Sequence, residues 1–178
     1  MKKSTIYLTA LMLIVAFGIA SCDLVKDLLD IEFTTGWKHI PFTVSPEKAG
    51  ELTYHNTYFQ SDLVQEIEDN GGTIDNLSNV EVSEARVAVL SPGRSLDPFA
   101  WVEVYLRALG DTDSSLVASG NDVNNGATQI EMVVDPISLN DILAQDEYVV
   151  TILGELDQNL ETEIDLEVQL KYDVTVKP

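Results

Sequence analysis

The chain has 178 residues, with 30 acidic against 10 basic side chains and a formal charge of −20. Such a surplus of carboxylates repels phosphate backbones and anionic lipid headgroups, which disfavours nucleic-acid binding and electrostatic adhesion to membranes. The carboxylates are explained by the solubility of an exported domain, and an acidic site for cations is the alternative.

The first 21 residues have the features of a secretory signal. Lys2 and Lys3 precede an uncharged, apolar run over residues 6–20, which is shorter than the roughly 20 residues of a stable transmembrane helix. The following Ile19-Ala20-Ser21-Cys22 resembles the lipobox of bacterial lipoproteins. The resemblance implies cleavage before Cys22 and lipid on its sulfur. An ordinary signal peptide with an incidental cysteine, or an uncleaved anchor helix, are the alternatives.

Cys22 is also the only cysteine, so no intrachain disulfide can form. Lipidation accounts for a lone thiol in an exported protein, and two or three acyl chains, at about 0.8 kcal/mol per buried CH₂, suffice as an anchor. The expected partner is therefore a membrane, reached through lipid on Cys22. We expect a cell-envelope location, on the outer rather than the inner membrane, although Asp23 after the cysteine is an inner-membrane signal in some bacteria.

Cleavage removes two lysines and no acid, which leaves 157 residues with a formal charge of −22. This length suits one domain with a substantial core. Residues 22–31 are predicted to form an acylated tether with a short amphipathic helix, because Leu24, Val25, Leu28 and Leu29 recur at helical spacing. A single domain is then expected over residues 32–178.

The domain begins with strand patterns. Alternation predicts a strand at 40–44, where Pro41 favours an edge position, and a second strand at 51–60. In the second strand, Leu52, Tyr54, Asn56 and Tyr58 share one face. A short helix is expected over 62–70, ended by two glycines at 71–72.

The middle of the chain mixes strands and loops. A strand at 79–90 changes phase near Ser83-Glu84, which indicates a bulge. A loop at 91–98 leads into a strand at 99–108, a short strand is possible at 116–118, and alternation resumes at 127–134. Ser138 and Asp141 have the spacing of a capping box, so one or two helical turns are expected over 139–144.

The last strands determine the fold class. Residues 148–156 and 164–176 form two strands, and in the second every other residue is apolar from Ile164 to Val176. One dry and one wet face per strand is typical of antiparallel sheets. We therefore predict an all-β antiparallel β-sandwich of about seven to nine strands with one to three short helices; a barrel is the alternative.

No catalytic or cofactor motif is found, and no cofactor is expected. His39 and His55 lack the spacing of a zinc site. Asp111, Asp113 and residues 121–126 group oxygen ligands, but they depart from a calcium loop and are better explained as turn residues.

One strand carries candidate ligand contacts. Trp101, Tyr105 and Arg107 share a face of the 99–108 strand and could stack on a sugar or hold a peptide. The favoured interpretation is burial of these aromatic residues beneath the predicted helices. The sequence thus predicts a lipid-anchored, non-enzymatic binding or structural domain, with an envelope protein or a glycan as a possible partner. A glycan- or ligand-binding module and a hydrolase with an unrecognised site are the alternatives.

Overall fold

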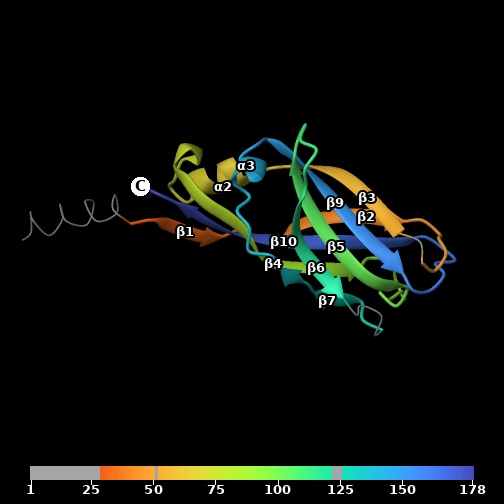
Figure 1. Ribbon diagram of the computed structural model, residues 1–178. Helices are drawn as coiled ribbons and strands as arrows, with labels where there is room; N and C mark the ends of the chain where they lie inside the picture. The colour runs from red at the N-terminus through yellow and green to blue at the C-terminus, as the bar shows by residue number, and fades with distance from the viewer. Residues whose placement is uncertain (1–28, 51, 122–125) are drawn as a thin grey trace, which may run out of the picture.

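The computed structural model describes residues 29–50, 52–121 and 126–178. Within these ranges, ten strands form two antiparallel sheets of five strands each, and β9 and β5 of one sheet cross over β10 of the other (Figure 1). The predicted antiparallel β-sandwich is confirmed. The signal segment, Cys22 and most of the tether lie outside the described residues. No helix in the described part of the chain is long and apolar enough to cross a membrane.

The first sheet is built around the last strand. In spatial order it contains β1 (Ile31–Thr34), β10 (Ile164–Val176), β4 (Leu77–Val89) and β7 (Gln129–Glu131), and β2 (Lys38–Val44) also pairs with β10. β10 alternates between buried apolar and outward polar residues throughout its length, as its sequence predicts. The predicted bulge is confirmed too, because the register between β10 and β4 shifts at Ser83.

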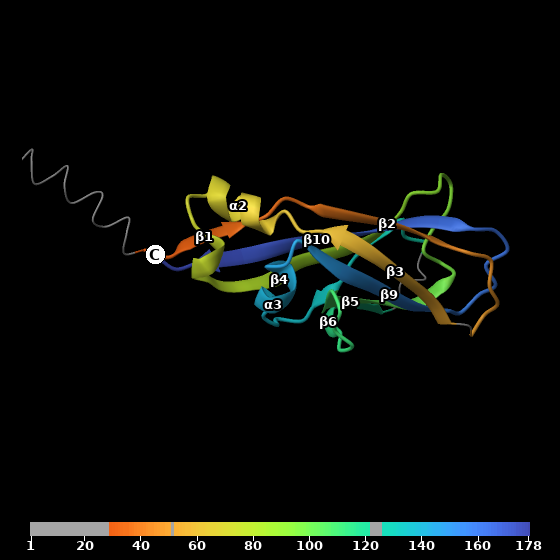
Figure 2. The same cartoon turned by 90° about the horizontal axis from the view of Figure 1, so that it is seen from above.

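The second sheet lies against the first (Figure 2). Its order is β3 (Leu52–Gln60), β9 (Glu147–Leu156), β5 (Phe99–Ala108), β6 (Ser115–Asn121) and β8 (Val133–Val134). The inward-facing residues of both sheets form one apolar core, which includes Val104, Leu106, Ile152, Leu166 and Leu170. β3 and β2 are edge strands, each paired on one side only within the described residues.

Two irregular segments explain why the strands are more numerous than predicted. β1 and β2 follow the same side of β10 but are separated at residues 35–37. There the hydroxyl of buried Thr35 accepts a hydrogen bond from Tyr172 N (3.0 Å), while Thr35 N donates to Tyr172 O (2.9 Å). Ile31, expected at the end of a helix, instead pairs with Val176 and begins β1.

The expected single strand at 127–134 is divided between the sheets. β7 pairs with β4 in the first sheet, whereas β8 pairs with β6 in the second. Buried Met132 lies at the crossing and donates its N–H to Ala85 O (2.9 Å). Residues 129–134 therefore connect the two sheets at this side of the sandwich.

Short helices cover one end of the core. They are α2 (Leu63–Asp69), the 3₁₀ turn η1 (Ile74–Asn76) and α3 (Asn140–Leu143). Leu63, Ile67 and Leu143 point from them into the core. The predicted capping box is wrong: α3 has no side-chain cap, and Asn140 instead accepts from Val80 N and donates to Ser78 O.

Candidate functional site

The outer face of the second sheet is the best candidate for a binding site. In β3, β9 and β5 every second side chain points away from the core. The cross-strand registers place these side chains in rows, including Tyr54–Leu153–Glu103 and Leu52–Glu155–Trp101. We call this surface the aromatic face and define it by its large side chains: Leu52, Tyr54, Tyr58, Trp101, Tyr105 and Leu153.

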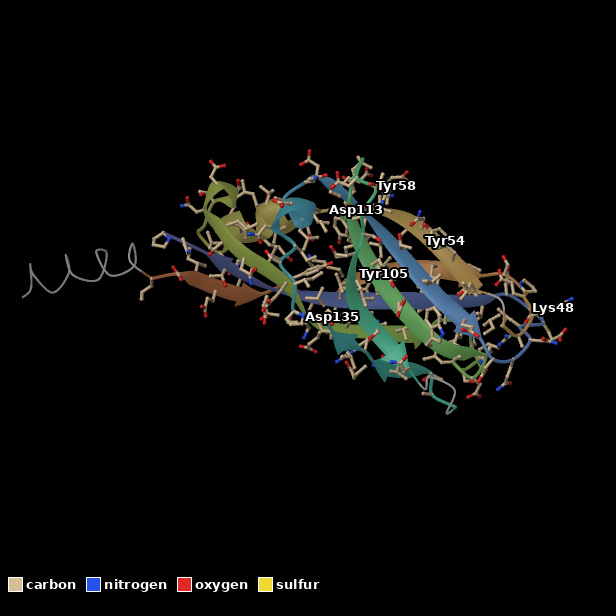
Figure 3. The ribbon with its side chains drawn as sticks, in the orientation of Figure 1. Lys48, Tyr54, Tyr58, Tyr105, Asp113 and Asp135 are labelled. Atoms are coloured by element: carbon tan, nitrogen blue, oxygen red, sulfur yellow. The ribbon has the colours of Figure 1, made fainter. Side chains whose placement is uncertain are left out.

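Apolar exposure is concentrated on this surface. Tyr54 and Tyr58 are 65% and 66% exposed, and Leu52 is 59% exposed. Val133 of β8, which pairs beside Ser119 on the same side of the sheet, is 69% exposed. These four belong to the seven large hydrophobic residues that are exposed in the described part of the chain. Figure 3 shows Tyr54 and Tyr58 on β3 and Tyr105 on β5, on the side of the sheet away from the core.

The three predicted contact residues all lie on the aromatic face, which the predicted helices do not cover. Trp101, Tyr105 and Arg107 are half-buried and outward, so the predicted burial of the two aromatic residues beneath the short helices is wrong. The reason is the alternation of β5, which sends Val102 and Leu106 inward, while the helices cover the end of the core instead.

Carboxylates hold the polar edges of these aromatic rings. Trp101 Nε1 donates to Glu155 Oε2 (3.0 Å), and the Tyr105 hydroxyl donates to Glu103 Oε2 (2.7 Å). This hydrogen bond to Glu103, aided by desolvation, raises the pKa of Tyr105. Because both rings are fixed at their polar edges, their faces are preorganised for stacking.

Polar groups lie between the aromatic residues. Asn56, Thr151 and Tyr105 form one row across β3, β9 and β5, and Thr151 Oγ1 donates to Asn56 Oδ1. Arg107 is directed to the end of the face, where it donates to Asp111 O. The surface thus combines apolar ring faces with hydrogen-bonding groups, as a sugar or peptide ligand requires.

Sequence reasoning did not select Tyr54 and Tyr58 as site residues. The available signal was that both tyrosines lie on one face of the predicted strand. The opposite face is not clearly more apolar than this one, since it carries Thr53, His55, Thr57 and Phe59. Only the packing of β3 on β9 determines which set faces solvent.

The outer face of the first sheet has a different chemistry. It carries the ion pairs Arg86–Glu131 (2.7 Å) and Lys171–Glu84 (2.9 Å). Both cations lie against the Trp37 ring, with Arg86 Cζ 4.1 Å and Lys171 Nζ 4.5 Å from the ring centroid. Its one large aromatic residue is therefore already occupied by the protein's own side chains.

The other candidate ligands are not brought together. His39 Nδ1 lies 3.0 Å from Glu167 on the first sheet, whereas the His55 ring lies 5.6 Å from that of Phe42. Burial lowers the pKa of His55. No group of three potential metal ligands occurs among the residues that the structure describes. Asp111 and Asp113 lie between β5 and β6, and residues 122–125 of the calcium hypothesis fall outside the described ranges.

A small polar cluster lies at the helical end of the sandwich, partly open to solvent. Lys38 Nζ, whose side chain is 11% exposed, contacts Asp62 (2.7 Å) and Glu66 (2.8 Å) beside Tyr148 and Tyr172. Burial lowers the Lys38 pKa, but the hydrogen bonds to both carboxylates outweigh it and the pKa is raised overall. The ion pairs join β2 to α2, which indicates a structural role.

Comparison with known proteins gives only remote structural similarities. No family model and no curated protein matches the sequence. Among solved structures, the chain is similar to nora virus (10% identity, TM-score 0.35, 83% of this chain and 61% of that one). It is also similar to a carbohydrate-binding module of the β-sandwich superfamily (9% identity, TM-score 0.37, 78% and 54%).

A third similarity is to the capsid of Ralstonia phage GP4 (11% identity, TM-score 0.36, 82% and 87%). The chain spans less than two thirds of the length of the first two of these structures. At these low TM-scores the similarities assign neither a family nor an activity to this chain.

Proposed function

We propose that this protein is a lipid-anchored, non-enzymatic binding module of the cell envelope, and that its ligand docks on the aromatic face. The observation that carries the proposal is the contrast between the two outer sheet faces. One is covered by ion pairs, whereas the other leaves Tyr54 and Tyr58 mostly exposed beside two preorganised rings.

A neutral glycan fits this surface best. Sugar rings present apolar faces to aromatic side chains and hydroxyls to polar groups such as those of Asn56 and Thr151. Glu103 and Glu155 at the aromatic rings, together with a formal charge of −20, disfavour anionic polysaccharides.

Binding to soluble neutral β-glucans, xylans and mannans tests the ligand class. The protein purified in detergent is compared with a Tyr54→Ser/Tyr58→Ser variant by affinity electrophoresis. We expect at least one polysaccharide to retard the wild type, and the variant to bind about tenfold more weakly, which is a loss of about 1.4 kcal/mol. His39→Ser/Thr43→Ser, on the outer face of the first sheet, is the matched control. If no neutral polysaccharide retards the wild type, the glycan proposal is wrong.

The proposed anchor is lipid on Cys22, with the outer membrane as the proposed site. Labelled palmitate should enter the wild type but not a Cys22→Ser variant, and density-gradient separation of the two membranes identifies the location. An unlabelled wild-type protein that is recovered outside the membrane fractions would exclude the anchor.

A further inference from the structure

The free edge of β3 has the properties of a strand-pairing site. Ser61 N donates to Asp146 O (2.8 Å), so these two residues are a hydrogen-bonded pair next to the ladder between β3 and β9. Hydrogen-bonded and non-hydrogen-bonded pairs alternate along an antiparallel ladder. Residues 53, 55, 57 and 59 therefore direct their backbone N–H and C=O groups to β9. Those of Leu52, Tyr54, Asn56, Tyr58 and Gln60 point away from β9, towards the open edge.

Exposed sheet edges are usually protected by charge, proline or short length. β2 contains Lys38 and Pro41, and β1 has four residues and includes Glu32. β7 and β8, with three and two residues, are shorter still. β3 has nine residues, no proline and no Asp, Glu, Lys or Arg. Among the described strands it is thus the one long edge without such protection.

We propose that β3 pairs antiparallel with β3 of a second copy of this chain. A two-fold axis at Asn56 is the register that pairs all nine residues of one strand with all nine of the other. It places Tyr54 of each copy opposite Tyr58 of its partner, and Leu52 opposite Gln60. The residues with free backbone groups then face one another, so that each can form ladder hydrogen bonds.

Side chains favour the same arrangement. Tyr54 and Tyr58 are the most exposed aromatic residues among the described large hydrophobics. In the two-fold register the four tyrosines of two copies form two cross-strand pairs on one surface, and such aromatic pairs stabilise antiparallel strands. The two second sheets would become one sheet of ten strands, with an uninterrupted aromatic face.

The acidic charges on β9 do not prevent this contact. On β9, the carboxylates opposite the ends of β3 are Glu147 and Glu155; in the sequence, Glu51 precedes β3 and Asp62 lies two residues beyond it. In the proposed register, Glu147 of one copy and Glu155 of the other are three strand spacings apart, or about 14 Å. This distance exceeds the Debye length of about 8 Å at physiological ionic strength, so their repulsion is largely screened.

Cysteine cross-linking in intact membranes tests the register. Two Asn56 Cα atoms across the axis would be about 5.5 Å apart, within the range that a disulfide spans. An Asn56→Cys variant of the full chain should give a dimer band of twice the monomer mass on a non-reducing gel. Thr43→Cys, an exposed position on the β2 edge, is the matched control, and the wild type measures any contribution of Cys22.

If Asn56→Cys gives no more dimer than Thr43→Cys, or is linked to a protein of different mass, self-pairing is wrong. A second measurement is sedimentation of the wild type in detergent against Tyr54→Lys/Tyr58→Lys, which places like charges opposite each other in the register. We expect a dimer for the wild type and a monomer for the variant; a monomeric wild type overturns the proposal. Neither readout depends on glycan binding.

Discussion

The hydroxyl oxygens of Tyr148 and Tyr172 lie 3.3 Å apart in the core, one from β9 of the second sheet and one from β10 of the first. Burial raises the pKa of both phenols further above neutral pH, where a tyrosine is already protonated. This is a polar contact between two sheets whose facing surfaces are otherwise mostly apolar.

Replacing either tyrosine with Phe should lower the free energy of unfolding by about 1–3 kcal/mol, because the remaining hydroxyl loses its partner inside the core. The double variant should cost less than the sum of the two single variants. Urea denaturation measures all three, with exposed Tyr58→Phe as the control. Strict additivity would show that the hydroxyls do not interact.

Lys38→Met should lower the free energy of unfolding, because Asp62 and Glu66 lose their cation. We expect a loss of about 1–3 kcal/mol, which lies between the losses typical of exposed and of buried ion pairs. The raised Lys38 pKa adds a pH dependence. Its stabilisation is complete below 10.5 and is lost as the pH rises through the folded-state value. The difference in stability between wild type and variant should therefore shrink in alkali; a constant difference would contradict this account.

The His55 pKa, lowered by burial, predicts a loss of stability in mild acid. The unfolded chain takes up a proton near pH 6.5, whereas the folded chain resists it, so stability falls as the pH drops from 6.5 towards the folded-state pKa. His55→Leu should remove this slope in thermal melts at several pH values. His39→Gln, on the outer face of the other sheet, should retain it. An unchanged slope in His55→Leu would assign the effect to another group.

Gly154 lies in β9 where neighbouring strands leave little room. A Cβ there would come within 3.0 Å of Trp101 O and 3.1 Å of Thr53 Oγ1. We expect Gly154→Ala to lower the free energy of unfolding by about 1–3 kcal/mol, because β5 or β3 must shift. Gly36→Ala, with no atom within 4 Å of its added Cβ, is the control. Equal melting temperatures for the two variants would contradict the predicted crowding.

Trp101 fluorescence reports on the aromatic face once the other tryptophan, Trp37, is replaced by Phe. Because Trp101 is half-exposed on the outer surface, acrylamide should quench its emission in the folded protein. A neutral polysaccharide that binds the face should reduce this quenching. Emission that resists acrylamide would place Trp101 in the interior, and quenching unchanged by a bound polysaccharide would place the ligand elsewhere.

Alternation along single strands is the part of the fold that the sequence predicts best. β10 and the bulge at Ser83 are confirmed because each depends on which side of one strand is apolar. The transfer of the chain between sheets at Met132 is not visible in this way, since Ile130, Met132 and Val134 keep their alternation across the transfer. Only the positions of β4 and β6 show that two sheets share this segment.

The candidate site, too, was predictable within one strand but not between strands. Trp101 and Tyr105 were found together on one face from their spacing, but whether that face was covered depended on where α2 and α3 packed. Tyr54 and Tyr58 join them through β9, which follows β3 by almost ninety residues in the chain. The capping box failed as a prediction because α3 begins one residue later than Ser138 requires, with Leu139 at the N-cap. Asn140, the first helical residue, bonds to β4, a distant segment.

The place of β10 has a consequence for how the polypeptide acquires its native state. Among the described strands it is the last to be synthesised, yet it lies between β1 and β2 on one side and β4 on the other. β1, β2 and β4 cannot pair with β10 until it has been synthesised, and pairings so distant in sequence are slow to form. In a chain that crosses a membrane from its N-terminus, the first sheet would therefore be completed only after residues 164–176 had emerged.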